Sequence, residues 1–276
     1  MADSLGFEAL FAVAALQDLT GKWALVSGAS AGIGKATACA LGAAGCNLAL
    51  VARRKSHLEE VAVAVRQRCP RVEVQLFAGD VAAEETYTAL RASGVLDRLD
   101  ILINNAGLAK GKEHVGEANL ADWKDMLDAN CLGAFRLVNE VLPGMIARGR
   151  GHVVTTGSIA GMEPYEGGSV YCATKSAVHA FVKALRYETY TKNIRCTVVA
   201  PGLTGAGTEF SEVRFGGDKQ KAAAVYEGVE ELKATDVAAQ IVWAVRQPSH
   251  VNVDMLHVMP TCQGGAGPRM HRAAKL

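Results

Sequence analysis

The chain has 276 residues, of which 50% are hydrophobic and 21% are charged, which is enough apolar material for a sizeable globular core. Its formal net charge of +1 argues against a general binder of nucleic-acid backbones, which would carry a clear basic excess. The seven cysteines contain no Cys-x-x-Cys pair and the seven histidines show no metal-ligand spacing, so we expect no metal site.

The two ends of the chain carry their own signals. Residues 7–16 are apolar but too short to span a membrane, so 1–20 is interpreted as an N-terminal extension. No basic start typical of a signal peptide is present, and we expect an intracellular, cytoplasmic protein with no membrane segment. The C-terminal tail, 261–276, ends in Ala274-Lys275-Leu276, which resembles the peroxisomal address Ser-Lys-Leu. A chance match of three residues stays open as the alternative.

Short apolar runs alternate with segments of helical length along the chain. The expected strands are 22–27, 47–52, 72–77, 99–103, 151–157, 194–200 and 253–258. The expected helices are 32–44, 55–68, 83–92, 119–148, 169–191 and 234–246. This alternation predicts an α/β fold of the Rossmann type, a doubly wound, seven-stranded parallel sheet with helices on both faces. No repeat or linker divides the chain, so we expect one domain over 1–276, with the long irregular segment 202–232 as a substrate lid.

A glycine-rich turn follows the first strand. It reads Ser27-Gly-Ala-Ser-Ala-Gly-Ile-Gly34 and opens a helix, as phosphate-binding turns do. The candidate cofactor contacts here are Gly28, Ser30, Gly32, Ile33 and Gly34. A phosphate loop of the Gly-x4-Gly-Lys-Ser/Thr type is excluded, because Ala29 replaces its first glycine and Ala36 its hydroxyl residue. A glycine-rich turn without a ligand is the alternative.

Three cations follow the second strand, about 20 residues past the glycines, where a site for NAD would place Asp or Glu on the ribose. The sequence there is Arg53-Arg54-Lys55. Arginine can grip a 2′-phosphate with paired donors, so we predict NADP(H), with Arg53 and Arg54 as contacts. The alternative is a solvated basic helix start.

Two further strand ends face the same crevice in such a sheet. The third strand ends at Asp80-Val81, and the fourth at Asn105-Ala106-Gly107. We expect all five residues to lie near the cofactor. Asn105 either holds a ribose or braces the backbone of the crevice, and both readings stay open.

A serine, a tyrosine and a lysine follow the fifth strand. Ser158 ends that strand, and Tyr171 and Lys175 are spaced to share one face of the expected helix 169–191. An ammonium one turn away, with an oxidised nicotinamide, would favour the phenolate of Tyr171 and bring it toward general acid/base work. Ser158 could donate to the substrate oxygen. The alternative for the tyrosine and lysine is a surface helix pair.

These motifs together resemble the short-chain dehydrogenase/reductase family over roughly residues 20–260. The matching elements are Ser27-Gly-x-x-x-Gly-Ile-Gly34, Asn104-Asn-Ala-Gly107, Asn130, Ser158, Tyr171-x-x-x-Lys175 and Pro201-Gly202. The resemblance implies that Asn130 holds a water linking Lys175 to solvent, and that Pro201, Gly202, Thr204 and Thr208 cover the cofactor. It also implies that helices 119–148 and 169–191 build a homodimer or homotetramer.

The segments around Ser158–Lys175 and 201–218 are similar to the NADP-dependent branch that oxidises 3-hydroxy acids such as serine and allo-threonine. This implies a hydride transfer with serine, allo-threonine, 3-hydroxyisobutyrate or 3-hydroxypropionate. A general ketone or aldehyde reductase is the alternative, and a non-catalytic NADP(H)-binding protein is a distant one. One departure is the stretch 204–207, which is one residue longer than usual.

A 3-hydroxy acid needs a cation for its carboxylate. Arg214 in the expected lid is the first candidate and Arg186 the second, while Tyr165 shapes the pocket wall. An ion pair of Arg214 with Glu209 or Glu212 is the alternative to a substrate contact.

Overall fold

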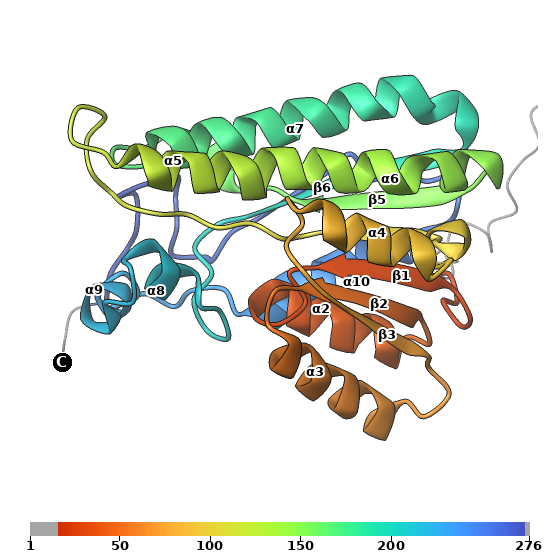
Figure 1. Ribbon diagram of the computed structural model, residues 1–276. Helices are drawn as coiled ribbons and strands as arrows, with labels where there is room; N and C mark the ends of the chain where they lie inside the picture. Colours follow the sequence, from red (N-terminus) through yellow and green to blue (C-terminus); the bar gives the residue numbers. More distant parts are fainter. Residues whose placement is uncertain (1–15, 274–276) are drawn as a thin grey trace, which may run out of the picture.

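A seven-stranded, entirely parallel sheet organises the chain (Figure 1). The structure is a computed structural model that describes residues 16–273. The strand order is β3-β2-β1-β4-β5-β6-β7. The bounds are β1 Trp23–Ser27, β2 Asn47–Ala52, β3 Val74–Ala78, β4 Ile101–Asn104, β5 Gly151–Thr156, β6 Ile194–Pro201 and β7 Met255–Val258. This confirms the predicted Rossmann-type architecture.

Helices cover both faces of the sheet (Figure 1). On one face lie α2 (Gly32–Ala43), α3 (Lys55–Arg68) and α10 (Ala234–Val245). On the other lie α4 (Glu84–Ala92), α5 (Leu120–Leu127), α6 (Ala134–Ala147) and α7 (Ser169–Thr189). Two small helices, α8 (Phe210–Arg214) and α9 (Lys219–Ala224), stand beyond the carboxyl ends of the strands.

Two apolar cores explain why the strands are apolar without alternation. Ala24 and Val26 of β1 pack in the core under α2, α3 and α10. Leu25 between them packs in the core on the opposite face, with Leu137 of α6 and Val182 of α7. Because successive side chains of a strand point to opposite faces, a strand covered on both sides must be apolar at every position.

The expected single helix 119–148 contains an interruption, which corrects that prediction. A π-helical turn, η2 (Asp128–Gly133), separates α5 from α6. Such turns are rare and occur often at functional sites. This one carries Asn130.

The expected irregular lid 202–232 is also partly wrong, because α8 and α9 form within it. The longer stretch 204–207 folds as a turn in which the N–H of Thr208 donates to the Gly205 carbonyl at 2.9 Å. It is fastened by Ala234, whose N–H donates to the Ala206 carbonyl at 2.9 Å. The segment 202–232 is therefore partly helical, and its role as a substrate lid stays a prediction.

The description of the structure stops short of both ends of the chain. Ala274-Lys275-Leu276 lies outside residues 16–273, so its reading as an address stays a prediction, as does one domain over the whole of 1–276. Within the described range no helix combines the length and apolarity that crossing a membrane requires. The same residues contain no cluster of His, Cys, Asp and Glu suited to a metal ion.

Candidate active site

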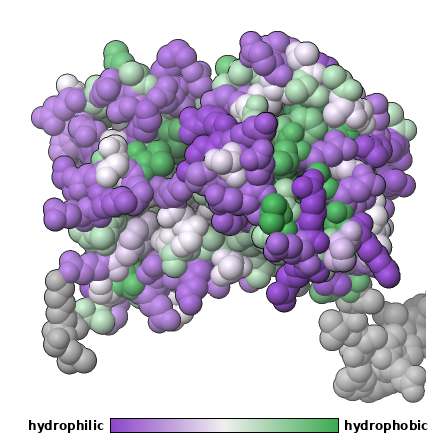
Figure 2. Space-filling model, turned by 60° about the horizontal axis from the view of Figure 1, so that its bottom comes forward, coloured by the Kyte–Doolittle hydropathy of each residue, from purple (hydrophilic) through white to green (hydrophobic). Residues whose placement is uncertain are grey.

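A cleft of about 1130 Å³ opens at the carboxyl ends of the strands. It lies where the strand order reverses between β1 and β4, the usual ligand position in such sheets. Every predicted site residue lines this cleft except Gly34, Asn130 and the second carboxylate candidate, Arg186. The molecular face drawn in Figure 2 is mostly hydrophilic and is broken by small apolar recesses.

The glycine turn forms the floor of the cleft at one end. Gly28 has φ of +67° and Gly32 φ of +57°, a conformation that side chains disfavour. At Gly34 the reason is closeness instead, because a Cβ atom there would lie 2.3 Å from the Gly28 carbonyl oxygen. The N-cap residue of α2, Ala31, makes no side-chain cap, so the first N–H groups of this helix are left for a ligand.

Asn105 braces the crevice in this structure, and a contact with a ribose stays a prediction. Its Nδ2 donates to the Ser27 carbonyl at 3.0 Å, and its Oδ1 accepts from the Thr156 hydroxyl at 3.1 Å. The Ser27 hydroxyl in turn accepts the N–H groups of Asn105 at 2.9 Å and Ala106 at 3.0 Å. The ends of β1, β4 and β5 are thereby tied together.

The arginines after β2 face the cleft, and one is paired with the lid. Arg53 and Arg54 are both exposed at its edge. Arg54 donates to Glu209 through both Nη atoms, at 3.0 and 2.8 Å, and to the Ser30 hydroxyl at 3.3 Å. The bond from Arg54 holds the pKa of Glu209 below its usual value. Glu209 is therefore paired with Arg54, one of the two arginines that we assigned to a 2′-phosphate.

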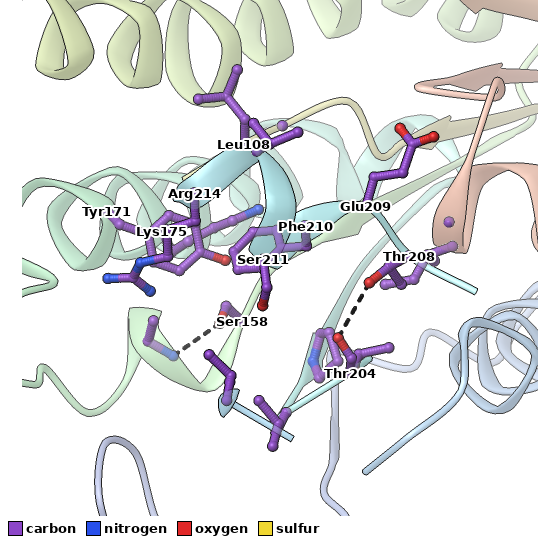
Figure 3. Close-up of a pocket in the computed structure, with 18 of the residues that line it drawn as sticks. Leu108, Ser158, Tyr171, Lys175, Thr204, Thr208, Glu209, Phe210, Ser211 and Arg214 are labelled. Atoms are coloured by element: carbon purple, nitrogen blue, oxygen red, sulfur yellow. Dashed lines mark hydrogen bonds between the residues drawn. The ribbon is translucent and has the colours of Figure 1, made fainter. Parts of the chain in front are cut away.

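Ser158, Tyr171 and Lys175 meet at the other end of the cleft (Figure 3). All three are buried, at 7%, 8% and 7% exposure. The Lys175 ammonium donates to the Thr156 carbonyl at 2.8 Å and lies 6.0 Å from the centre of the Tyr171 ring. Phe210 of α8 packs edge-on against that ring, with centres 5.6 Å apart.

The electrostatics of this end differ from the expectation in one respect. Burial raises the pKa of Tyr171 above its ordinary value, and Tyr165 raises it further, while hydrogen bonding to Ser158 and the charge of Arg214 lower it. We expected Lys175 to lower the pKa of Tyr171, but it is not among the groups that shift this pKa. Burial instead lowers the pKa of Lys175 to about 8. Without a bound cofactor, Tyr171 is therefore a protonated phenol at neutral pH.

Asn130 is buried behind the catalytic end. Its Oδ1 accepts the Leu108 N–H at 2.8 Å, and its Nδ2 donates to the Leu108 carbonyl at 2.8 Å and to the Thr174 hydroxyl at 3.0 Å. A Cβ atom on Gly107 would lie 2.9 Å from Asn130 Oδ1 and 3.7 Å from Lys175 Nζ. Asn130 thus ties the π-helical turn to the loop after β4 and to α7, close to Lys175.

Arg214 lies beside Tyr171, and its predicted ion pair with Glu209 or Glu212 is not formed in the described structure. Its guanidinium donates to the Gly111 carbonyl at 3.1 Å, the Tyr165 hydroxyl at 2.6 Å and the Gly167 carbonyl at 2.8 Å. The second candidate, Arg186, faces away from the cleft, where it pairs with Asp254 at 3.3 Å.

The sequence reasoning missed two parts of the wall. Phe210, which opens the short helix α8, lines the cleft although it is not among the predicted site residues. The residues Ala266, Gly267 and Pro268 of the C-terminal tail also line the cleft. The N–H of Ala266 donates to Glu163 at 3.1 Å, a long-range contact that no local pattern indicates.

Comparisons with known proteins identify the family of this chain. The family model described as short chain dehydrogenase matches residues 22–215. An NADP-dependent 3-hydroxy acid dehydrogenase of Schizosaccharomyces pombe is 42% identical over 256 residues, covering 90% of this chain and 96% of that protein. A protein named NADP-dependent 3-hydroxy acid dehydrogenase YdfG, from Escherichia coli K12, is 38% identical over 248 residues, 90% of this chain and 98% of its own. The solved closed form of a serine dehydrogenase complexed with NADP+ has a TM-score of 0.83 at 36% identity, covering 91% of this chain and 100% of that chain. The resemblance inferred from the sequence is therefore confirmed, and the chain belongs to the short-chain dehydrogenase family.

Proposed function

We propose that this chain is an NADP-dependent oxidoreductase that transfers a hydride between the nicotinamide and a small 3-hydroxy acid. The observation that carries the proposal is the meeting of Ser158, Tyr171 and Lys175 at one end of a cleft whose other end is a glycine turn flanked by arginines. The names of the relatives support the cofactor and the hydroxy-acid class. Which small 3-hydroxy acid is the substrate is the most specific part of the proposal.

The residues at the cofactor end fit a dinucleotide phosphate. The missing side chain of Gly34 lets the turn lie against the start of α2, whose free N–H groups suit a pyrophosphate. Arg53 and Arg54 suit a 2′-phosphate, since guanidinium groups bind phosphate through paired donors. Asp80, Val81, Ala106, Gly107, Pro201, Gly202, Thr204 and Thr208 complete the proposed binding surface.

The bound cofactor would accept or donate the hydride, and the chain's own residues would manage the proton. Tyr171 would exchange a proton with the substrate oxygen, and Ser158 would hold that oxygen by a hydrogen bond. The Lys175 ammonium, fixed by Thr156, would supply positive charge beside the phenol. Asn130 would keep the loop after β4 in place around Lys175, with a water-linked proton path from Lys175 as a further part of its role.

Arg214 is the proposed partner of the substrate carboxylate. A guanidinium has five N–H donors, and the protein uses three of those of Arg214, which leaves two for a ligand. Tyr165 holds the guanidinium in place, which reduces the entropy cost of a paired contact. Arg214 and Tyr171 both line the cleft, and the charge of Arg214 lowers the pKa of Tyr171, which supports placing them against one substrate.

The test is NADP+ reduction with L-serine, L-allo-threonine, 3-hydroxyisobutyrate and 3-hydroxypropionate, each beside an alcohol of the same size that lacks the carboxylate. We expect turnover of one or more acids, loss of turnover in Tyr171→Phe, and a raised KM for acids only in Arg214→Ala. Equal kcat/KM for acids and matched alcohols would favour the general carbonyl reductase instead. No turnover of either class would contradict an oxidoreductase of CH–OH groups.

We also propose that the chain forms a homodimer or homotetramer through α5, α6 and α7. Large apolar side chains are exposed around α5 and the π-helical turn, including Leu127 at 48% and Leu132 at 56%. Sedimentation at equilibrium would test this, with Leu132→Asp expected to shift the chain toward monomer.

A further inference from the structure

The turn that carries Ser158 wraps around the imidazole of His179. This histidine stands on α7 one helical turn after Lys175. A Cβ atom on Gly157 would lie 2.3 Å from His179 Nε2, and one on Gly161 would lie 2.6 Å from its Cε1. The two glycines near Ser158 therefore leave the hollow that the ring fills, and no larger residue at either place is compatible with it.

The imidazole of His179 also accepts a hydrogen bond from the backbone of Ser158. The Ser158 N–H donates to His179 Nε2 at 3.4 Å. The neighbouring bonds are separate: the N–H of Gly157 donates to the Val199 carbonyl at 2.8 Å, and the hydroxyl of Ser176 donates to the Gly161 carbonyl at 3.0 Å. His179 is thus the residue of α7 that accepts the Ser158 N–H, beside the Ser176 bond that fastens Gly161 of the same turn.

The charge state of the imidazole suits this role. Burial lowers the pKa of His179 to about 4, with smaller contributions in the same direction from Lys175 and His257. The ring is therefore neutral at neutral pH. Because Nε2 accepts a hydrogen bond, its proton lies on Nδ1. A lone pair remains at Nε2 over the whole range in which Tyr171 and Lys175 would work.

We propose that His179 is a positioning residue for the hydride-transfer reaction, which fixes the Ser158 turn on α7 so that the Ser158 hydroxyl stays beside Tyr171. The inference rests on the proposed function. It acts through Ser158, since His179 itself does not line the cleft. Hydrogen bonding to Ser158 is one of the two influences that lower the pKa of Tyr171, the other being Arg214, against burial, Tyr165 and Cys172. A displaced Ser158 would leave Tyr171 a weaker acid as well as a poorly held substrate.

The experiment compares His179→Leu, which fills the hollow without an acceptor, with His179→Gln, whose amide oxygen can reach the Ser158 N–H. We expect His179→Leu to lower kcat about 10-fold or more, since small misplacements of reacting groups have effects of this size. The KM for NADP+ should stay unchanged, and the pH midpoint of kcat assigned to Tyr171 should move upward. His179→Gln should restore most of kcat and the midpoint. Lys183→Leu, at an exposed site one turn further along α7, is the matched control and should behave as the wild type.

The two proposals fail in different ways. If the wild type oxidises no hydroxy acid, the proposed function fails, and the His179 comparison is then made on NADPH-dependent reduction of a simple diketone. The positioning role is refuted if His179→Leu keeps the kcat of Lys183→Leu. It is equally refuted if His179→Gln is as slow as His179→Leu, or if the loss follows only the folded fraction seen by circular dichroism.

Discussion

Burial of the Lys175 ammonium should lower the free energy of unfolding of the chain by an amount that depends on pH. The Lys175→Met variant removes the charge and keeps most of the volume of the side chain. Burial lowers the pKa of Lys175 from 10.5 to about 8. At about 1.4 kcal/mol for each pKa unit, the buried ammonium costs the folded state about 3 kcal/mol at neutral pH.

The sign of the pH dependence follows from the two pKa values. Below about pH 8 the lysine is protonated in both the folded and the unfolded chain, and the full cost is present. Between about 8 and 10.5 the folded chain has lost the proton and the unfolded chain still holds it, so wild-type stability rises with pH. The difference in unfolding free energy between wild type and variant should therefore move in favour of the wild type by about 2 kcal/mol from about pH 7.5 to about pH 10.

Urea unfolding of both proteins across this pH range, without cofactor, measures the difference. The lost hydrogen bond to Thr156 and any change in packing add an offset that does not depend on pH, so only the change matters. Lys183→Met, an exposed lysine on the same helix, is the control and should show no such change. A wild-type to Lys175→Met difference that stays constant with pH would refute the reasoning. The variant should lose turnover at every pH.

Three further outcomes follow from the cofactor end. Gly34→Ala should cost about 1–3 kcal/mol of stability and weaken NADP+ binding, because its Cβ would meet the Gly28 carbonyl, whereas Gly116→Ala, with open space around it, should be neutral in urea unfolding. Glu209→Gln should tighten NADP+ binding by about 2- to 5-fold in titration calorimetry, because Arg54 is then free for the phosphate, and weaker binding would contradict the competition. Ser27→Ala should cost about 1–3 kcal/mol, because two backbone N–H groups lose their buried acceptor, and an unchanged unfolding midpoint would count against that account.

The strands were predictable because a strand covered on both faces must be apolar throughout. The carboxyl ends of parallel β1, β4 and β5 must meet at one edge of the sheet, so the sequence alone predicts that Ser158 and Tyr171 lie near the glycine turn. The π-helical turn was not predictable, because residues 119–148 have helical periodicity and a wider turn leaves no local signal. The pairing of Glu209 with Arg54 was also missed, since it joins residues far apart in the chain and depends on where the lid folds back.

The same limit applies to energetics at the catalytic end. A Tyr-x-x-x-Lys spacing indicates that two side chains share a helix face, and that much was found. It does not indicate how deeply they are buried, and burial decides the direction of both pKa shifts. His179 was passed over for a similar reason. Its meaning depends on two glycines in another segment that only the fold brings around it.

The widened turn between α5 and α6 has a consequence for how the chain tolerates changes in length. The π-helical turn 128–133 holds one residue more than an α-helical turn would, so removing one of its residues would let a continuous α-helix form with α5 and α6 still in phase. The apolar stripe of α6, with Leu137, Val138 and Val141, would then keep its place in the core. A single-residue deletion in 128–133 should therefore leave a folded chain in which Asn130 is displaced, whereas a deletion inside α6 should turn the residues after it by about 100° and unfold the chain.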